Sequence, residues 1–151
     1  MSVFVEQSNT LIWRRTHSED WSWNFVLLTN PMLKALQELH QAGIDTVLFM
    51  SPIFPYITDW KAIIEETKDY VHEYWFENLN LRGSYKQAIL QYIDSHYSKW
   101  SNAYRSIYIQ NDEAYWEQLT TELEEYCSRE SIKYKNYFYH EKLVKEKHRG
   151  R

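Results

Sequence analysis

The chain has little cysteine: Cys127 is the only one among its 151 residues. A single thiol excludes a disulfide within the chain, and it cannot supply the several thiolates that an iron–sulfur cluster or a cysteine-built zinc site requires. Cysteine usage therefore gives no indication of an oxidising compartment. Because Cys127 falls on the apolar side of a predicted helix, we expect it to be a small core residue.

Glycine and proline are also scarce, with three of each. Few chain breakers predict long elements joined by short connections. No glycine-rich phosphate loop, serine nucleophile elbow or HExxH zinc motif is present. His17, Glu19 and Asp20 lie close together, but their spacing matches no metal-ligand pattern, and a polar loop is the better interpretation.

The chain lacks an excess of positive charge and long apolar runs. Its net charge of −4 argues against a protein that binds mainly nucleic-acid backbone. No run of about 18 apolar residues occurs, so no membrane-spanning helix is expected. The beginning of the chain does not resemble a signal peptide, and the cytoplasm is the expected location. A basic tail at 142–151 is interpreted as a solvated helix, with weak anion binding as the alternative.

Aromatic residues are abundant, at 17% of the chain. They could provide stacking platforms for bases. Most of them fall inside apolar strands or on apolar helical stripes, which favours packing in the core.

The order of elements predicts one α/β domain over residues 1–151 with a parallel sheet. Residues 1–30 have the weakest periodicity of the chain, with short strands expected at 3–6 and 9–15. Three later runs are read as strands: 45–50, 73–79 and 134–140. The first is almost uniformly apolar and therefore typical of a buried parallel strand. Residues 51–57 are read as a loop, and a short helix is expected at the C-terminal end.

Local signals place the helices between these strands. Asn30 or Thr29 caps a first helix that Gly43 ends, and Thr58 or Asp59 caps a second. The fourth helix begins at Asn111 or Asp112. For the third helix, the predicted inward stripe is Tyr85, Ala88, Ile89, Tyr92, Ile93 and His96.

Candidate ligand-binding residues follow two of the predicted strands, in the stretches 50–59 and 77–83. In parallel α/β folds, ligands bind beyond the carboxyl ends of the strands. Glu77, Asn78, Asn80 and Arg82 place carboxylate, amide and guanidinium groups around one such end. Amides can read an adenine edge or a ribose, and arginine can hold a carboxylate in a fork. The alternative is that these residues make the turn and that Arg82 pairs with a surface acid.

Three segments at these strand ends resemble radical S-adenosylmethionine proteins related to spore photoproduct lyase, in their C-terminal half. The segments are 36–44 (LQELHQAGI), 49–59 (FMSPIFPYITD) and 76–83 (FENLNLRG), within an overall resemblance over 31–141. The resemblance implies the C-terminal half of a partial TIM-type (β/α) barrel. It also implies that Ser51, Pro52 and Ile53 line the adenosyl part of S-adenosylmethionine, with Glu77, Asn78, Asn80 and Arg82 around the same site.

The chain departs from that family in one respect, because it contains no CxxxCxxC motif for the cluster. We therefore expect a radical S-adenosylmethionine-like domain without its own iron–sulfur cluster. It would be catalytically inactive alone, with an S-adenosylmethionine or nucleoside pocket retained. Open sheet edges predict a homodimer or a partner chain.

Two alternatives stay open. One is a small interaction module that docks a protein through an aromatic-rich surface and binds no ligand. The other is a cluster-free hydrolase or transferase that uses Glu77 or His140 as a base, which requires both groups to converge in a pocket.

Overall fold

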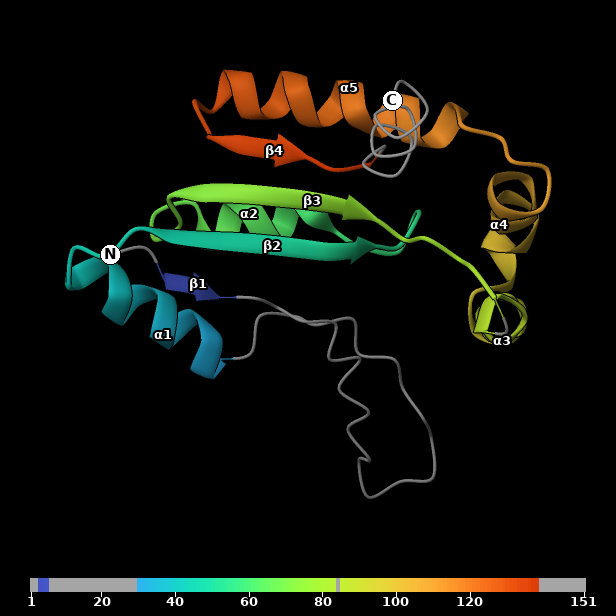
Figure 1. Ribbon diagram of the computed structural model, residues 1–151, viewed down its shortest axis with the longest axis horizontal. Helices are drawn as coiled ribbons and strands as arrows, with labels where there is room; N and C mark the ends of the chain where they lie inside the picture. The colour runs from blue at the N-terminus through green and yellow to red at the C-terminus, as the bar shows by residue number, and fades with distance from the viewer. Residues whose placement is uncertain (1–2, 6–29, 84, 139–151) are drawn as a thin grey trace, which may run out of the picture.

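A computed structural model describes residues 3–5, 30–83 and 85–138 (Figure 1). These residues form a parallel sheet flanked by helices. The predicted α/β architecture with a parallel sheet is thereby confirmed. The expected strand at 9–15, the loop around His17, His140 at the end of the last predicted strand, and the expected helix at the C-terminal end lie outside the described residues.

Among the described residues, four parallel strands lie side by side in the order in which they occur along the chain. They are β1 (Val3–Val5), β2 (Thr46–Ile53), β3 (Glu73–Asn78) and β4 (Tyr134–Asn136). Parallel neighbours need a crossover connection, and helices supply these connections. The helices are α1 (Asn30–Gln41), α2 (Trp60–Thr67), α3 (Tyr85–His96), α4 (Ser101–Tyr108) and α5 (Ala114–Arg129), with a 3₁₀ turn η1 (Ser98–Trp100) before α4.

Two predicted helix ends, at Asp59 and at Gly43, are confirmed. The Asp59 side chain accepts a hydrogen bond from the Ala62 backbone N–H at 3.1 Å and caps α2. Gly43 has φ +70° just after α1, where the Gly43 and Ile44 N–H groups bond back to the carbonyls of His40 and Leu39. This is the left-handed ending that glycine adopts without steric cost.

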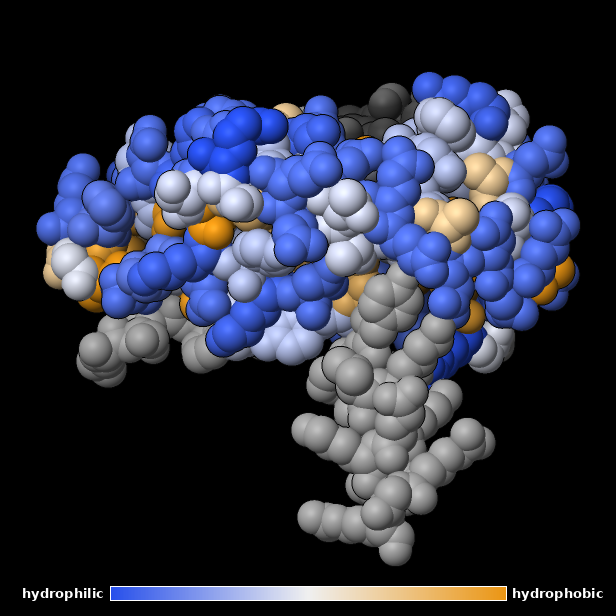
Figure 2. All heavy atoms as spheres, turned by 90° about the horizontal axis from the view of Figure 1, so that it is seen from above, coloured by the Kyte–Doolittle hydropathy of each residue, from blue (hydrophilic) through white to orange (hydrophobic). Residues whose placement is uncertain are grey.

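One face of the sheet is covered by helices. Its residues alternate along the strands and are almost fully buried, as in Leu48, Met50, Tyr74 and Phe76. They form one core cluster with helical residues that include Leu36 of α1, Ile64 of α2, and Leu123 and Cys127 of α5. Most aromatic residues of the described ranges lie in this core or pack against it, as predicted. The molecular face on the α5 side is mostly hydrophilic, with small separated apolar spots (Figure 2).

The other face of the sheet is half-buried. Phe49, Trp75 and Tyr137 form an aromatic cluster on it, with ring centroids between 5.6 and 6.3 Å apart and edge-to-face geometry. The Lys135 ammonium lies 4.6 Å from the Trp75 ring. Ser51 and Glu77 follow the same alternation and lie toward the carboxyl ends of their strands.

Three sequence predictions are wrong in detail. The strand β2 continues to Ile53, and its register against β3 shifts between Met50 and Ile53, which accommodates Pro52. The strand β4 ends at Asn136 rather than at His140. Helix α3 buries Leu90 and Ile93, whereas Tyr85 is 50% exposed and Ala88 is also exposed.

No element was predicted over residues 98–108, where the structure has η1 and α4. Within the described ranges, no helix combines the length and apolar character needed to cross a bilayer.

Candidate functional site

The carboxyl ends of β2 and β3 bring Ser51 and Glu77 together. The Ser51 hydroxyl donates a hydrogen bond to the Glu77 carboxylate across the two strands. Both side chains are partly buried. A carboxylate held in this way keeps further lone pairs for a donor on a ligand, such as a ribose hydroxyl or an amine.

Pro52 and Ile53 continue the strand beyond Ser51. Pro52 is half-buried and follows a cis peptide bond, whereas Ile53 is fully buried in the core. The Ile53 carbonyl accepts a hydrogen bond from the Leu79 N–H at 3.0 Å, and Ile53 is the strand partner of Asn78. Ile53 therefore fixes the relative position of the two strand ends, and its side chain faces the core.

Asn80 and Arg82 lie in the connection that follows β3. The Arg82 Nε donates to the Asn80 side-chain oxygen at 3.1 Å, and the Tyr85 hydroxyl donates to the Asn80 carbonyl at 2.5 Å. Both Asn80 and Arg82 are exposed, and Asn78 before them is half-buried. The predicted residues thus form two groups, each held by a hydrogen bond between its own members. One group, Ser51 and Glu77, lies at the strand ends, and the other, Asn80 and Arg82, lies in the connection beyond β3.

Two buried tyrosines of α4 anchor the connections that follow β2 and β3. Tyr104 donates to the Pro55 carbonyl at 3.0 Å, and Tyr108 donates to the Leu79 carbonyl at 2.9 Å. Burial raises the pKa of both phenols, so each stays protonated as a donor at neutral pH. Sequence reasoning missed them because it assigned no helix to this region.

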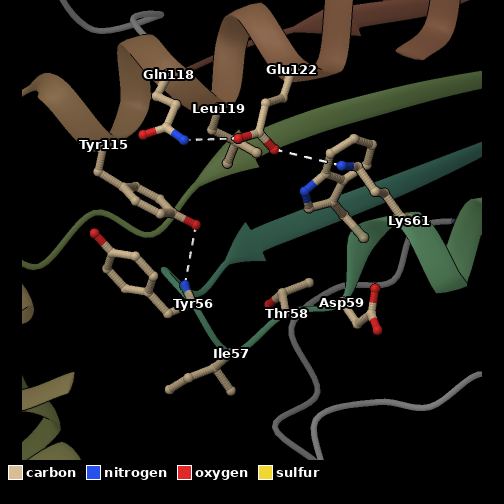
Figure 3. Close-up of a pocket in the computed structure, with 10 residues that line it drawn as sticks. Tyr56, Ile57, Thr58, Asp59, Lys61, Tyr115, Gln118, Leu119 and Glu122 are labelled. Carbon is tan, nitrogen blue, oxygen red and sulfur yellow. Dashed lines mark hydrogen bonds and ion pairs between the residues drawn. The ribbon is translucent and has the colours of Figure 1, made fainter. Parts of the chain in front are cut away.

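A second feature, a cleft of about 460 Å³, lies between the β2–α2 connection and α5 (Figure 3). Tyr56, Thr58, Asp59 and Lys61 line one side, and Tyr115, Gln118 and Glu122 line the other. The Tyr115 hydroxyl accepts a hydrogen bond from the Tyr56 N–H at 3.1 Å, and burial raises the pKa of Tyr115. The segment 49–59 was singled out from the sequence, but periodicity could not show that it meets α5 here.

Metal ligation has no support in the described part of the chain, where no group of three or more His, Cys, Asp or Glu side chains could hold an ion. His40, His72 and His96 are all exposed. Cys127 is fully buried, and burial raises its pKa to about 11, so at neutral pH it is a protonated thiol. The prediction that Cys127 is a core residue is confirmed.

Comparison with known proteins gives one curated relative, "Uncharacterized protein MJ0683" of Methanocaldococcus jannaschii. It is 38% identical over 65 residues, which are 43% of this chain and 24% of the relative. The match thus spans about a quarter of the length of that relative. No family model and no solved structure matches the chain.

Proposed function

We propose that this chain is the C-terminal half of a radical S-adenosylmethionine-type (β/α) barrel, without its own cluster, and that it binds the adenosyl part of S-adenosylmethionine or a related nucleoside. The observation that supports the barrel is the strand order, because four parallel strands lie in chain order with helices packed on one face. A doubly wound sheet reverses that order at its switch point. In a barrel, the other face of the sheet points inward.

The Ser51–Glu77 pair supports the position of the pocket. It lies on the half-buried face at the carboxyl ends of adjacent strands, where ligands of parallel α/β folds bind. We assign Glu77 to a ribose hydroxyl or an amine of the ligand. Asn78, Asn80 and Arg82 form the rim, and the Arg82 guanidinium holds the carboxylate of a methionyl group. Pro52 and the backbone at Ile53 contact the adenosyl part.

Catalysis by the isolated chain is not part of this proposal, because Cys127 is a single, buried thiol. A cluster would need three further thiolates from residues outside this sequence. A homodimer or a partner that covers the sheet edges would complete the barrel. Sedimentation at micromolar concentrations tests this expectation, and a monomer at every concentration would contradict it.

Calorimetric titration with S-adenosylmethionine tests the pocket. We expect the wild-type chain to bind, and Asn80→Ala/Arg82→Ala and Glu77→Gln to weaken binding by about tenfold or more, since each removes a charged or polar ligand contact. Arg129→Ala is the matched control, because Arg129 is an exposed arginine at the C-terminal end of α5. The proposal fails if the wild-type chain shows no heat at millimolar ligand.

A protein-interaction module without a ligand is the second candidate. The exposed Tyr56 ring, stacked at 4.5 Å on Trp100, favours it because an exposed aromatic ring on a fixed support suits a protein contact. Two results together would select this candidate. The chain would fail to bind S-adenosylmethionine, and it would form a stable complex with a protein partner that the Tyr56→Ala variant no longer forms.

A further inference from the structure

The cleft between the β2–α2 connection and α5 has features that the proposed adenosyl pocket does not use. Neither Ser51 nor Glu77 lines it, and its walls are Tyr56 to Lys61 on one side and α5 on the other (Figure 3). Its volume of about 460 Å³ is in the range of small-ligand sites. An inference about this cleft is therefore independent of the proposed function.

Tyr56 is held in an uncommon backbone conformation at the cleft. Its φ is +62°, which is strained for a bulky residue, and the residue is 44% exposed. Two contacts keep it in place: the ring stacks on Trp100 with planes 13° apart, and the backbone N–H bonds to the Tyr115 hydroxyl. Residues held in sparsely populated backbone regions cluster at active sites, ligand clamps and switch regions. The Tyr56 and Tyr115 rings are 4.6 Å apart and give this side of the cleft aromatic surface.

The opposite wall carries a carboxylate that already binds a cation. Glu122 accepts a hydrogen bond from the Gln118 amide at 2.9 Å and lies 3.7 Å from the Lys61 ammonium. The Lys61 and Glu122 side chains are 52% and 40% exposed, so their ion pair is weak and can be exchanged. Asp59 adds a second carboxylate to the lining. With one lysine against two acids, the cleft favours a cationic ligand.

We propose that this cleft binds a guanidinium group. The planar cation lies against the Tyr56 and Tyr115 rings, and its N–H groups donate to Glu122 in place of Lys61. Guanidinium fits this combination better than ammonium, because it is planar, stacks on aromatic rings and donates to a carboxylate in a fork. The group could come from a small arginine derivative or from an arginine in a peptide.

The first test is titration of the purified chain with acetyl-arginine amide, followed by two-dimensional NMR of the backbone amides. Acetyl-citrulline amide is the matched ligand control, because it has the same shape without the charge. We expect the arginine ligand to bind at least about tenfold more tightly and to shift the amides of Tyr56 and Lys61. Equal binding of the two ligands, or no binding up to about 10 mM, would overturn the proposal.

Protein variants test which groups are responsible. Glu122→Gln should weaken binding about tenfold, whereas Glu124→Gln, the same change at an exposed position two residues along α5, should have no effect. Lys61→Met should strengthen binding several-fold, since it removes the competing cation. Loss of binding in Lys61→Met would instead identify an anion site and refute the proposal.

The aromatic contribution is tested at Tyr56. Tyr56→Phe keeps the ring and should bind as wild type, whereas Tyr56→Ala should bind less tightly, with circular dichroism to confirm that it folds. Equal binding by the Phe and Ala variants would contradict a role for the ring.

A peptide copying residues 142–151, which contains Arg149 and Arg151, distinguishes the source of the guanidinium group. Binding of this peptide at least about tenfold tighter than that of the single arginine ligand selects a peptide. Equal binding of the two selects a small molecule.

Discussion

The Tyr104 hydroxyl donates a hydrogen bond to the carbonyl oxygen of Pro55, 3.0 Å away and 49 residues earlier in the chain. Tyr108, one turn further along α4, does the same for Leu79. Helix α4 thus holds the connection after β2, which carries Tyr56 and Asp59 of the cleft, and the connection after β3, which carries Asn80 and Arg82.

Removing the Tyr104 hydroxyl should destabilise the fold. Tyr104 is fully buried, so Tyr104→Phe leaves the Pro55 carbonyl without that donor in an apolar environment. We expect the free energy of unfolding to fall by about 2 kcal/mol, measured by urea denaturation. Tyr85→Phe is the control, since the Tyr85 hydroxyl also donates to a carbonyl but the side chain is 50% exposed. Its effect should stay below about 0.5 kcal/mol, and equal effects would argue against the anchor.

A buried polar pair connects α2 to β3. The Thr67 hydroxyl donates to the Ile63 carbonyl at 2.7 Å and lies 2.7 Å from the Tyr74 hydroxyl, which therefore acts as the donor to Thr67. Thr67→Val removes the acceptor for a buried phenol and should cost about 2 kcal/mol. The double variant Thr67→Val/Tyr74→Phe should be more stable than the sum of the single changes predicts, because it removes both polar groups. Additive losses in urea denaturation would contradict the coupling.

The end of α5 offers a stabilising substitution. Ser131 has φ +57°, and the Ser131 and Ile132 N–H groups bond back to the carbonyls of Ser128 and Cys127. Glycine adopts this conformation without steric cost, so Ser131→Gly should raise the free energy of unfolding by up to about 1 kcal/mol. Ser128→Gly, inside the helix, should lower it by about the same amount. Thermal denaturation of the two variants gives the comparison, and a loss of stability in both would show that the side chain of Ser131 matters.

Alkaline pH should destabilise the protein in part through Cys127. Burial raises the pKa of this thiol from 9.0 to about 11, so the folded state holds the proton more tightly than the unfolded chain does. The stability that the protonated Cys127 thiol contributes is fully present below about pH 9 and is lost as the pH rises toward 11. Melting temperatures measured across this range should fall, and they should fall less steeply in Cys127→Ala.

The burial of Cys127 also predicts slow thiol labelling. At pH 8 the thiol should react with a maleimide only as fast as the protein opens, and rapid labelling of the native protein would contradict its burial.

The sequence determined the local features of this protein. Gly43 and Asp59 mark helix ends through their own backbone and side-chain chemistry, and apolar runs such as 45–50 are typical of buried parallel strands whatever lies around them. The alternation of these signals was sufficient for the parallel α/β fold, and the polar residues at and beyond the ends of β2 and β3 could be located from the predicted strands alone. One cysteine was sufficient to exclude a cluster held by this chain by itself.

Tertiary structure decided the features that depend on distant partners. On α3, a stripe through Tyr85 and Ala88 and a stripe through Leu90 and Ile93 both fit helical periodicity, and the position of the helix against its neighbours selected the second. The proline at 52 suggested a loop, but the register shift between Met50 and Ile53 allows β2 to continue. The Ser51–Glu77 hydrogen bond, the Tyr104 anchor and the cleft between Tyr56 and Glu122 join residues 26 to 66 positions apart. Such contacts arise from packing and register, which a single sequence does not encode locally.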